Sequence, residues 1–361
     1  MVHIALVFGG RSPEHEVSIV SARFVAKTLR EAGYQVTPIG ITTQGEWLSG
    51  DGAFNQLCER IGAPASGAAA QHRAQAIHVL QTVNCDIVFP LIHGISGEDG
   101  VIQGFCDLLE LPFVGGDVLN QSICFDKLAT RQVLSQIGLP QPQFLALYRH
   151  QFEGGRYWLV DEVERQLPYP LFIKPSRTGS SIGISKTHSR AELETALDVA
   201  FRYDERVVVE VGIVGREMEV SALGGAIPFL SAIGEIVPEN EFYDYAEKYL
   251  KSSTQFHIPA DLPTERAQLL HDYARRAWTA THCFGLARID FMVSEDHIFL
   301  NEINTMPGFT KISMYPKLLQ QSGISAVEAL TQIVQLGLER GSSASRATTF
   351  LSHSDWFKGE S

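Results

Sequence analysis

Residues 286–308 set two apolar, strand-like runs around Arg288, Asp290, Glu302 and Asn304, and this combination restricts the fold more than any other stretch. Both runs alternate with the period of a strand that has one buried side. Acidic residues are depleted in strands, and buried oxygen-bearing side chains need partners to offset the cost of desolvation. A hairpin would bring Asp290, Glu302 and Asn304 together. These are hard oxygen ligands of the kind that holds Mg²⁺.

The register of this hairpin decides whether the three side chains meet. In the second run, residues 298–304, we expect Glu302 and Asn304 to share a face with Ile298 and Leu300. Even-numbered residues of both runs lie on one face only if the connection at residues 294–297 has an odd number of residues or the strand pair contains a bulge. The alternative is a hairpin whose acids face solvent and pair with the neighbouring arginine.

The first third of the chain alternates strands with helices. We expect strands at residues 3–8, 34–41 and 86–91, and helices at about 13–32 and 101–109. Residues 63–76 are rich in small side chains and are expected to form a loose surface segment. This order is typical of an open parallel sheet, whose binding crevice lies at the carboxyl ends of the strands.

Two glycine-containing breaks, Gly9-Gly10 and His93-Gly94, lie at the ends of strands of this predicted sheet, which makes Glu14 and His93 candidate site residues. The sequence lacks G-x-G-x-x-G, so a Rossmann dehydrogenase is disfavoured. Alternatively, Glu14 compensates the helix dipole and His93 is a histidine hydrogen-bonded within a turn.

The middle of the chain carries two lysines and a polar loop. We expect one helix over residues 120–137 that contains Lys127, and a strand that ends at Lys174. The loop 175–181, with Ser180 and Ser181, offers N–H groups and hydroxyls to phosphate before a strand resumes at residues 182–184. It is not a P-loop, because the order G-x-x-x-x-G-K-[ST] is absent. A plain surface hairpin is the alternative.

Further strands are expected at residues 206–211, with Glu210 near the end, and at 217–223, beginning at Glu217. Residues 237–257 combine many polar side chains with aromatic ones that include Phe242 and Tyr249. A long aromatic loop is more often a functional lid than filler, although an irregular surface turn is the alternative. Helices are expected at residues 189–201, 263–283 and 326–340, followed by a polar, frayed tail.

Composition limits the class of protein. A net charge of −12 argues against a general nucleic-acid binder, although a local basic pocket for phosphate remains compatible with it. No apolar run approaches the length of a membrane span, and the N-terminus does not have the pattern of a signal peptide. We therefore expect a cytoplasmic protein without membrane or nucleic-acid partners.

Two lysines, a Ser/Gly loop and an acidic cluster with an adjacent arginine form a set that favours phosphoryl transfer. Six stretches in order then resemble the ATP-grasp family, and within it the ligases that join two D-alanines. They are GGRSPEHEVS from Gly9, HGISGEDG from His93, KPSRTGSSIGISK from Lys174, EFYDYAEKY from Glu241, RIDF from Arg288 and NEINTMPGFT from Asn301.

The resemblance covers nearly the whole chain and implies an α/β fold that becomes α+β in its C-terminal half. An N-terminal open parallel-sheet domain, 1–120, would bind substrate. A central lobe with the phosphate lid, 121–213, and a lobe with the metal site and long loop, 214–345, would form the two-lobed ATP-grasp fold. A polar tail, 346–361, would follow. The family also suggests a homodimer.

The implied reaction uses ATP to phosphorylate the carboxylate of one D-alanine, and the amine of a second D-alanine then attacks the acyl phosphate. The products are D-alanyl-D-alanine for peptidoglycan precursors, ADP and phosphate. Two Mg²⁺ ions, with Mn²⁺ as a substitute, would be held by Asp290, Glu302 and Asn304, with Glu302 bridging them. Arg288 and the backbone of Gly308 would stabilise the tetrahedral intermediate.

The remaining roles that the resemblance implies concern ATP and substrate. The ATP-binding residues would be Lys127, Lys174, Ser181, Glu210, Glu217, Phe242 and Lys248. Glu14 would bind the ammonium of the first D-alanine, His93 would orient its carboxylate, and Ser313 would bind the carboxylate of the second. Glu14, Ser180 and Tyr249 would form a hydrogen-bonded latch over the site.

Two features depart from the family pattern. Val211 and Gly212 follow Glu210 where the family has a bulky or charged residue, and Lys311 places a charge near the substrate carboxylates. Three alternatives stay open: a depsipeptide ligase that uses D-lactate, a non-catalytic ATP-binding module and a metal phosphohydrolase. In the family that this chain resembles, a tyrosine in the long loop marks the dipeptide enzymes, so Tyr249 favours that activity over the use of D-lactate. A phosphohydrolase gives no reason for Glu14 and Tyr249.

Overall fold

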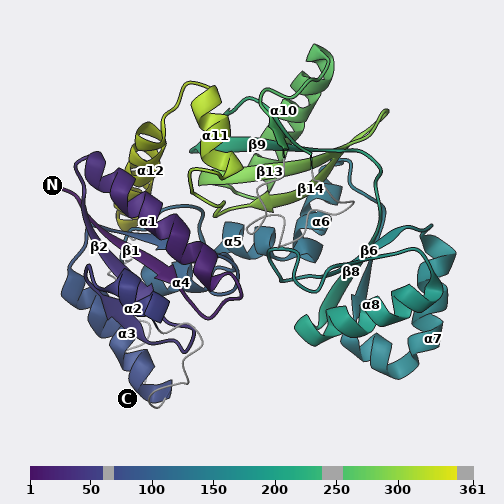
Figure 1. Ribbon diagram of the computed structural model, residues 1–361, viewed down its shortest axis with the longest axis horizontal. Helices are drawn as coiled ribbons and strands as arrows, with labels where there is room; N and C mark the ends of the chain where they lie inside the picture. The colour runs from purple at the N-terminus through teal and green to yellow at the C-terminus, as the bar shows by residue number, and fades with distance from the viewer. Residues whose placement is uncertain (60–68, 238–254, 348–361) are drawn as a thin grey trace, which may run out of the picture.

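The computed structural model describes residues 1–59, 69–237 and 255–347. Its N-terminal part is a four-stranded sheet in the order β3-β2-β1-β4 (Figure 1). The strands are β1 (His3–Gly9), β2 (Gln35–Ile41), β3 (Trp47–Ser49) and β4 (Ile87–Leu91). β1 runs parallel to β2 and β4, and β3 is an antiparallel edge strand. The predicted parallel sheet is confirmed, and β1 and β4 end side by side.

Side chains alternate along β1, so both faces of the sheet are covered. Ile4, Leu6 and Phe8 pack with α1 (His15–Glu31) and the C-terminal helix α12 (Ala326–Ala347). Ala5 and Val7 on the opposite face pack with α3 (Ala69–Val83) and α4 (Val101–Leu108). A short helix, α2 (Ala53–Glu59), packs against β2. The end of the described chain thus returns to cover its first strand.

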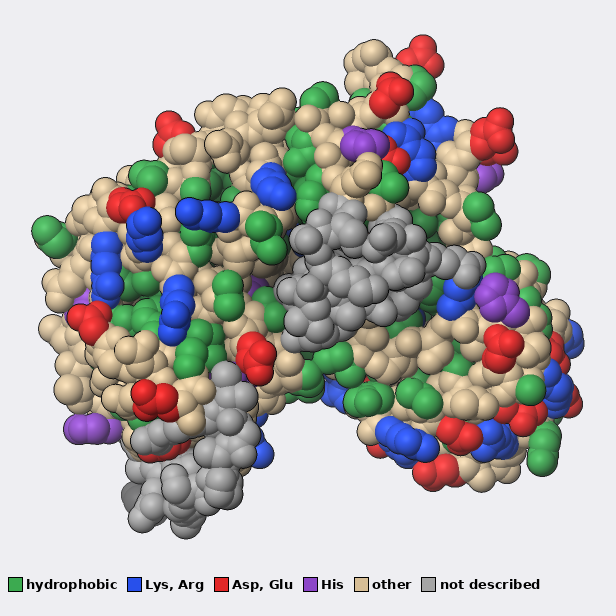
Figure 2. Space-filling view, viewed as in Figure 1, with side chains coloured by type: hydrophobic (Ala, Val, Ile, Leu, Met, Phe, Trp, Pro, Cys, Tyr) green, Lys and Arg blue, Asp and Glu red, His purple; other side chains and the backbone are tan. Residues whose placement is uncertain are grey.

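The central lobe is a second sheet, antiparallel, in the order β5-β8-β6-β7. Its strands are β5 (Phe144–Tyr148), β6 (Leu171–Pro175), β7 (Ser185–Thr187) and β8 (Arg206–Val211). α7 (Arg149–Gln166) and α8 (Arg190–Tyr203) contribute to its core. Acidic and basic side chains are interspersed over this lobe (Figure 2), where Arg156 pairs with Asp198 and Arg190 with Glu164. These pairs join the two helices.

The third sheet is antiparallel in the order β12-β11-β9-β13-β14, with β10 also paired to β9. Its strands are β9 (Arg216–Gly224), β10 (Pro228–Leu230), β11 (Gly234–Val237), β12 (Gln255–His257), β13 (Gly285–Val293) and β14 (Ile298–Asn304). α10 (Thr264–Ala280) supplies Trp278 and Leu270 to the core on one side. α11 (Met314–Gln321) packs against β9, where the Tyr315 hydroxyl donates to the Ala222 carbonyl over 3.1 Å.

Two short helices lie between the lobes, α5 (Val118–Phe125) and α6 (Lys127–Gln136) (Figure 1). The predicted single helix over residues 120–137 is therefore wrong. It breaks at Asp126, which has extended backbone angles and accepts hydrogen bonds from the N–H groups of Leu128 and Ala129. An aspartate that caps a new helix in this way satisfies N–H groups that have no helical partner. The break places Lys127 at the first turn of α6.

Other sequence-based boundaries change as well. The segment 63–76 is helical from Ala69, because its alanines favour a helix. Residues 182–184 form a turn rather than a strand, and β7 begins at Ser185. α12 extends to Ala347, seven residues beyond the predicted end, and the rest of the predicted polar tail lies outside the described residues. Within the part described, no helix is long and apolar enough to cross a membrane.

Replacing Gly97 by alanine should destabilise the loop after β4. A β-carbon at Gly97 would lie 1.9 Å from the carbonyl oxygen of Ile92, so backbone would have to move. We expect the free energy of unfolding to fall by about 2 kcal/mol, a typical cost of overpacking. Gly154→Ala is the matched control, because nothing lies within 4 Å of its β-carbon position. Urea unfolding compares the free energies of unfolding of the two variants. Equal values would contradict the close packing of Gly97 against the Ile92 carbonyl.

Candidate active site

A bulge in the β13–β14 hairpin brings the predicted metal ligands together. Val293 pairs with Ile298, so the connection has four residues, an even number. The register then shifts between Asp290 and Phe291, and Asp290 lies directly opposite Glu302. The parity condition is thus met by the bulge. The expectation that Glu302 shares a face with Leu300 is wrong, because the extra residue reverses the alternation and leaves Leu300 in the core.

Arg288 neutralises this acidic cluster. Its Nε and Nη2 donate to the two carboxylate oxygens of Asp290 over 2.8 and 2.7 Å, and Nε lies 3.1 Å from Oε1 of Glu219. Burial alone would lower the pKa of Arg288, but Asp290 and Glu219 hold that pKa well above its ordinary value. Asp290 is only 1% exposed, so the alternative of a solvent-facing acid is wrong for this residue.

Asn304 completes the cluster by contacting both acids. Its Nδ2 donates to Asp290 Oδ2 over 2.9 Å and lies 3.5 Å from Glu302 Oε1. Two carboxylates and an amide therefore converge on one face of the hairpin. Hard oxygen donors in this number fit Mg²⁺, which usually keeps waters and phosphate oxygens in its remaining positions.

Lys174 and Arg131 share one buried acid, Glu210. Nη2 of Arg131 lies 2.6 Å from Glu210 Oε2, and Lys174 Nζ forms an ion pair with the other carboxylate oxygen. Burial alone would raise the pKa of Glu210, but the charges of Arg131 and Lys174 lower it below its ordinary value. Lys174 Nζ also lies 3.4 Å from Oδ1 of Asn301, the bulge residue. The ammonium is therefore tied to both the central lobe and the hairpin.

The loop between β6 and β7 reaches the N-terminal domain. The Ser180 hydroxyl donates to the Glu14 carboxylate, and Ser180 and Ser181 adopt left-handed backbone angles with φ of 47° and 61°. A β-carbon at Gly179 would lie 2.4 Å from Glu14 Oε2, and one at Gly94 would lie 2.7 Å from that oxygen. Both glycines therefore leave room for the Glu14 carboxylate. Two of the three predicted latch residues are in contact.

His93, which follows the end of β4, is held in place by Glu98. His93 Nδ1 lies 3.5 Å from Oε1 of Glu98, and Nε2 lies 3.1 Å from the Ser21 hydroxyl. Burial by itself would lower the pKa of His93, but Glu98 and the nearby charge of Glu14 raise it above its ordinary value. Burial raises the pKa of Glu98. His93 is thus held between Glu98 and Ser21, with the charge of Glu14 nearby.

Ser313 and Gly308 lie close together before α11. A β-carbon at Gly308 would be 3.2 Å from the Ser313 hydroxyl oxygen, which also accepts a hydrogen bond from the Thr310 N–H over 3.1 Å. Lys311 is exposed beside them. Glu217 lies on β9 between Ile236 and Met292 of the neighbouring strands, two positions from Glu219, which lies opposite Asp290. Phe242, Lys248 and Tyr249 lie outside the described residues.

Sequence reasoning missed four charged residues of this region: Glu98, Asp126, Arg131 and Glu219. Arg131 and Glu219 are 3% and 2% exposed. Arg131 lies within a helix and Glu219 within a strand. Nothing in the neighbouring sequence shows that either side chain pairs with a residue far along the chain. The one usable signal was Asp126 followed directly by Lys127, because aspartate favours a helix start.

Comparisons with known proteins agree with this geometry. Residues 3–116 match the family described as "D-ala D-ala ligase N-terminus", and residues 133–335 match "D-ala D-ala ligase C-terminus". The D-alanine–D-alanine ligase of Clostridium novyi (strain NT) is 41% identical over 93% of this chain and 98% of its own length. That of Chloroherpeton thalassium is also 41% identical, over 93% of this chain and 96% of its own.

Solved structures give the same result. The D-alanine–D-alanine ligase from Coxiella burnetii superposes with a TM-score of 0.78 at 31% identity, over 96% of each chain. VanG D-Ala:D-Ser ligase from Enterococcus faecalis gives 0.78 at 33% identity, over 93% of this chain and 99% of its own. A parallel-sheet domain followed by two antiparallel lobes is thus the architecture of an ATP-grasp enzyme. The chain belongs to the D-alanine–D-alanine ligase family.

Replacing Glu210 by glutamine should destabilise the protein in a pH-dependent way. Two buried cations would lose their shared counter-charge, at a cost of about 3 kcal/mol near neutral pH. Because the folded pKa of Glu210 is lowered, its contribution is complete above about pH 4.5 and is lost as the pH falls below that value. Denaturant unfolding from pH 7 to about pH 3 measures the difference in unfolding free energy between the variant and wild type, and this difference should become smaller below about pH 4.5.

The control for this measurement is Asp161→Asn, which removes an acid that pairs with Arg190 but is 66% exposed. Exposed pairs add little to stability, so this variant should resemble wild type at every pH. A difference for Glu210→Gln that stays constant as the pH falls would contradict the assigned charges.

Proposed function

We propose that this protein joins two D-alanines to D-alanyl-D-alanine with ATP, through an acyl phosphate, and so supplies a peptidoglycan precursor. The observation that carries the proposal is the convergence of Asp290, Glu302 and Asn304 on one face of the hairpin, beside Arg288. Membership of the family supports it. The homodimer and the cytoplasmic location stay predictions.

The three oxygen ligands would hold divalent ions, two in the family pattern, and these ions would neutralise the phosphate charge of ATP. Lys127 and Lys174 add positive charge from the side of the central lobe. Because phosphoryl transfer depends mostly on positioning and charge neutralisation, cations that are already held in place need little rearrangement.

In the first step a carboxylate oxygen of one D-alanine attacks the γ-phosphorus, and the bond from that phosphorus to the oxygen of ADP breaks. Glu14 would hold the ammonium group of this D-alanine, and His93 would orient its carboxylate. Glu14 and His93 are both buried, and Ser180 contacts Glu14. This burial excludes water, which would hydrolyse the acyl phosphate formed in this step.

In the second step the amine of another D-alanine, having lost a proton, attacks the acyl carbon. The carbon–oxygen bond to phosphate then breaks, and phosphate leaves with the electron pair. Arg288 and the N–H of Gly308 would stabilise the oxyanion, and Ser313 would bind the carboxylate of the incoming D-alanine. The pairing of Arg288 with Asp290 supports this role, because it fixes the guanidinium beside the cluster.

A second candidate differs only in the incoming substrate. One solved relative at 33% identity is named a D-Ala:D-Ser ligase, so the same architecture serves another acceptor in that protein. Phosphate release with ATP, Mg²⁺ and a panel of D-alanine, D-serine and D-lactate, combined with product analysis, separates these possibilities. We expect D-alanyl-D-alanine at neutral pH. ATP consumption that is independent of D-alanine would refute the ligase proposal.

Glu302→Gln should lower turnover at least about 100-fold while the fold is retained, since one ligand charge is lost. Mn²⁺ binding followed by electron paramagnetic resonance gives a readout that does not depend on activity, and we expect weaker binding. Glu295→Gln, at the exposed tip of the same hairpin, is the matched control. Wild-type Mn²⁺ affinity in Glu302→Gln would refute the metal assignment.

Glu14→Gln should raise the Michaelis constant for D-alanine by about 10- to 100-fold, the value of a hydrogen bond to a charged group. Its Michaelis constant for ATP should not change, because glutamine can still accept the Ser180 hydroxyl and keep the lid in place. Glu16→Gln, exposed on the first turn of the same helix, should behave as wild type. Equal increases in the Michaelis constants for D-alanine and ATP would contradict the proposal that Glu14 binds the ammonium group of D-alanine.

A further inference from the structure

Asp126 connects two parts of the chain that carry the candidate phosphate-binding lysines. On one side its Oδ1 accepts hydrogen bonds from the N–H groups of Leu128 and Ala129 over 3.1 and 3.2 Å, at the start of α6. Lys127 is the first residue of that helix. The cap therefore fixes the backbone from which the Lys127 side chain extends.

On the other side Asp126 accepts a hydrogen bond from the Ser176 hydroxyl. Ser176 is 0% exposed and follows Lys174 by two residues, at the point where β6 passes into the lid. The Lys127 N–H donates to the Ser176 carbonyl over 2.9 Å, and Lys127 Nζ donates to the carbonyl of Thr178. One carboxylate thus contacts the segments of both lysines.

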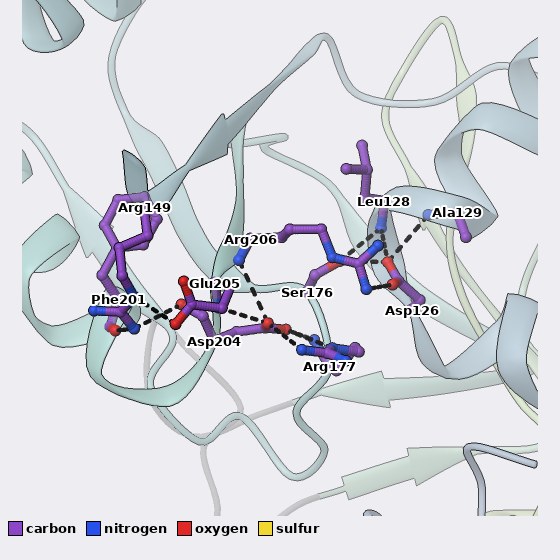
Figure 3. Close-up of polar contacts among 10 residues, drawn as sticks. All are labelled: Asp126, Leu128, Ala129, Arg149, Ser176, Arg177, Phe201, Asp204, Glu205 and Arg206. Carbon is purple, nitrogen blue, oxygen red and sulfur yellow. Dashed lines mark hydrogen bonds and ion pairs between the residues drawn. The ribbon is translucent and has the colours of Figure 1, made fainter. Parts of the chain in front are cut away.

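Arg206 supplies the opposite charge. It comes from the start of β8, and its guanidinium forms an ion pair with Asp126 Oδ2. Its backbone carbonyl accepts the Ser176 N–H over 2.9 Å. Figure 3 shows the Arg206 side chain extending away from Glu205 toward Asp126 and Ser176. Asp126 therefore uses one oxygen for the backbone and serine and the other for the arginine.

A second acid, Asp204, fixes the next residue of the lid. Its carboxylate accepts the Arg177 N–H over 2.8 Å and pairs with the Arg177 guanidinium over 2.8 Å. Burial alone would raise the pKa of Asp204, but Arg177 lowers it below its ordinary value. Figure 3 shows Asp204 beside Glu205, with its carboxylate directed toward Arg177. Consecutive lid residues are thus held by separate acids.

We propose that Asp126, held by Arg206, is a positioning residue that sets the relative placement of Lys127 and Lys174 for the phosphates of ATP. This inference rests on the proposed function of those lysines. It differs from a simple helix-capping role, because a cap needs only Oδ1, whereas the placement of the lid also needs the charge on Oδ2 and its arginine.

Asp126→Asn separates the two roles. Asparagine is as good an N-cap as aspartate, so the start of α6 should be retained. The side chain loses its charge toward Arg206 and offers at most an amide in its place. We expect the dissociation constant of MgATP, measured by calorimetry without D-alanine, to rise about 10-fold, while the thermal midpoint stays close to that of wild type.

Arg206→Gln tests the other half of the pair. It should weaken MgATP binding similarly, and the double variant Asp126→Asn/Arg206→Gln should be no weaker than the poorer single variant, because both act through one contact. Glu205→Gln is the matched control. It removes the neighbouring ion pair of Arg149 with the exposed Glu205, which does not contact Ser176 or Asp126, and it should bind MgATP as wild type does.

MgATP affinity is measured by calorimetry and D-alanyl-D-alanine formation by the ligase assay, so the two results are independent. Unchanged MgATP affinity in Asp126→Asn, or additive losses in the double variant, would overturn the positioning role whatever the ligase assay gives. Failure of the wild type to form D-alanyl-D-alanine would instead refute the proposed function, and the calorimetric comparison would still decide the role of Asp126. In an active enzyme, the Michaelis constant for ATP should rise while that for D-alanine stays within about twofold.

Discussion

The single bulge at Asn301 is the constraint on which the hairpin site depends. If the pairing of Val293 with Ile298 continued without interruption, Glu302 would lie opposite Ile289, and its side chain would point into the apolar core. Burying a carboxylate there would cost several kcal/mol. One additional residue moves Glu302 and its neighbour Asn304 to the other face, where Arg288 is available. The core and the acidic face therefore come from the same strands.

The same physical rule governs the other charges that surround this face. Glu210 is buried between Arg131 and Lys174, and His93 lies against Glu98. Because a buried charge is tolerated only with a partner, these groups have few alternative positions. The result is a set of side chains whose orientation is fixed before any ligand arrives, which is the condition for electrostatic stabilisation without large rearrangement.

Local periodicity predicted most strands and helices, the parallel sheet and the acids of the hairpin, because those features depend on neighbours in sequence. Periodicity showed that the acids could meet only with an odd-length connection or a bulge. It could not show which of the two occurs, because that depends on how the two strands pair. Periodicity also predicted one continuous helix across Asp126. The helix breaks there because tertiary contacts with Ser176 and Arg206 favour a break. Charges such as Arg131, whose partner Glu210 lies 79 residues away, leave no local pattern to detect.

The packing of α12 on the first sheet bears on how this chain folds during synthesis. Strand β1 is synthesised before α12, yet the face that carries Leu6 and Phe8 is completed by Leu330 and Ile333 of that helix. Contacts across almost the entire length of a chain form late, because closing so large a loop is entropically costly. The N-terminal sheet is therefore made before the helix that completes its packing, and part of its apolar face stays uncovered until α12 has been synthesised.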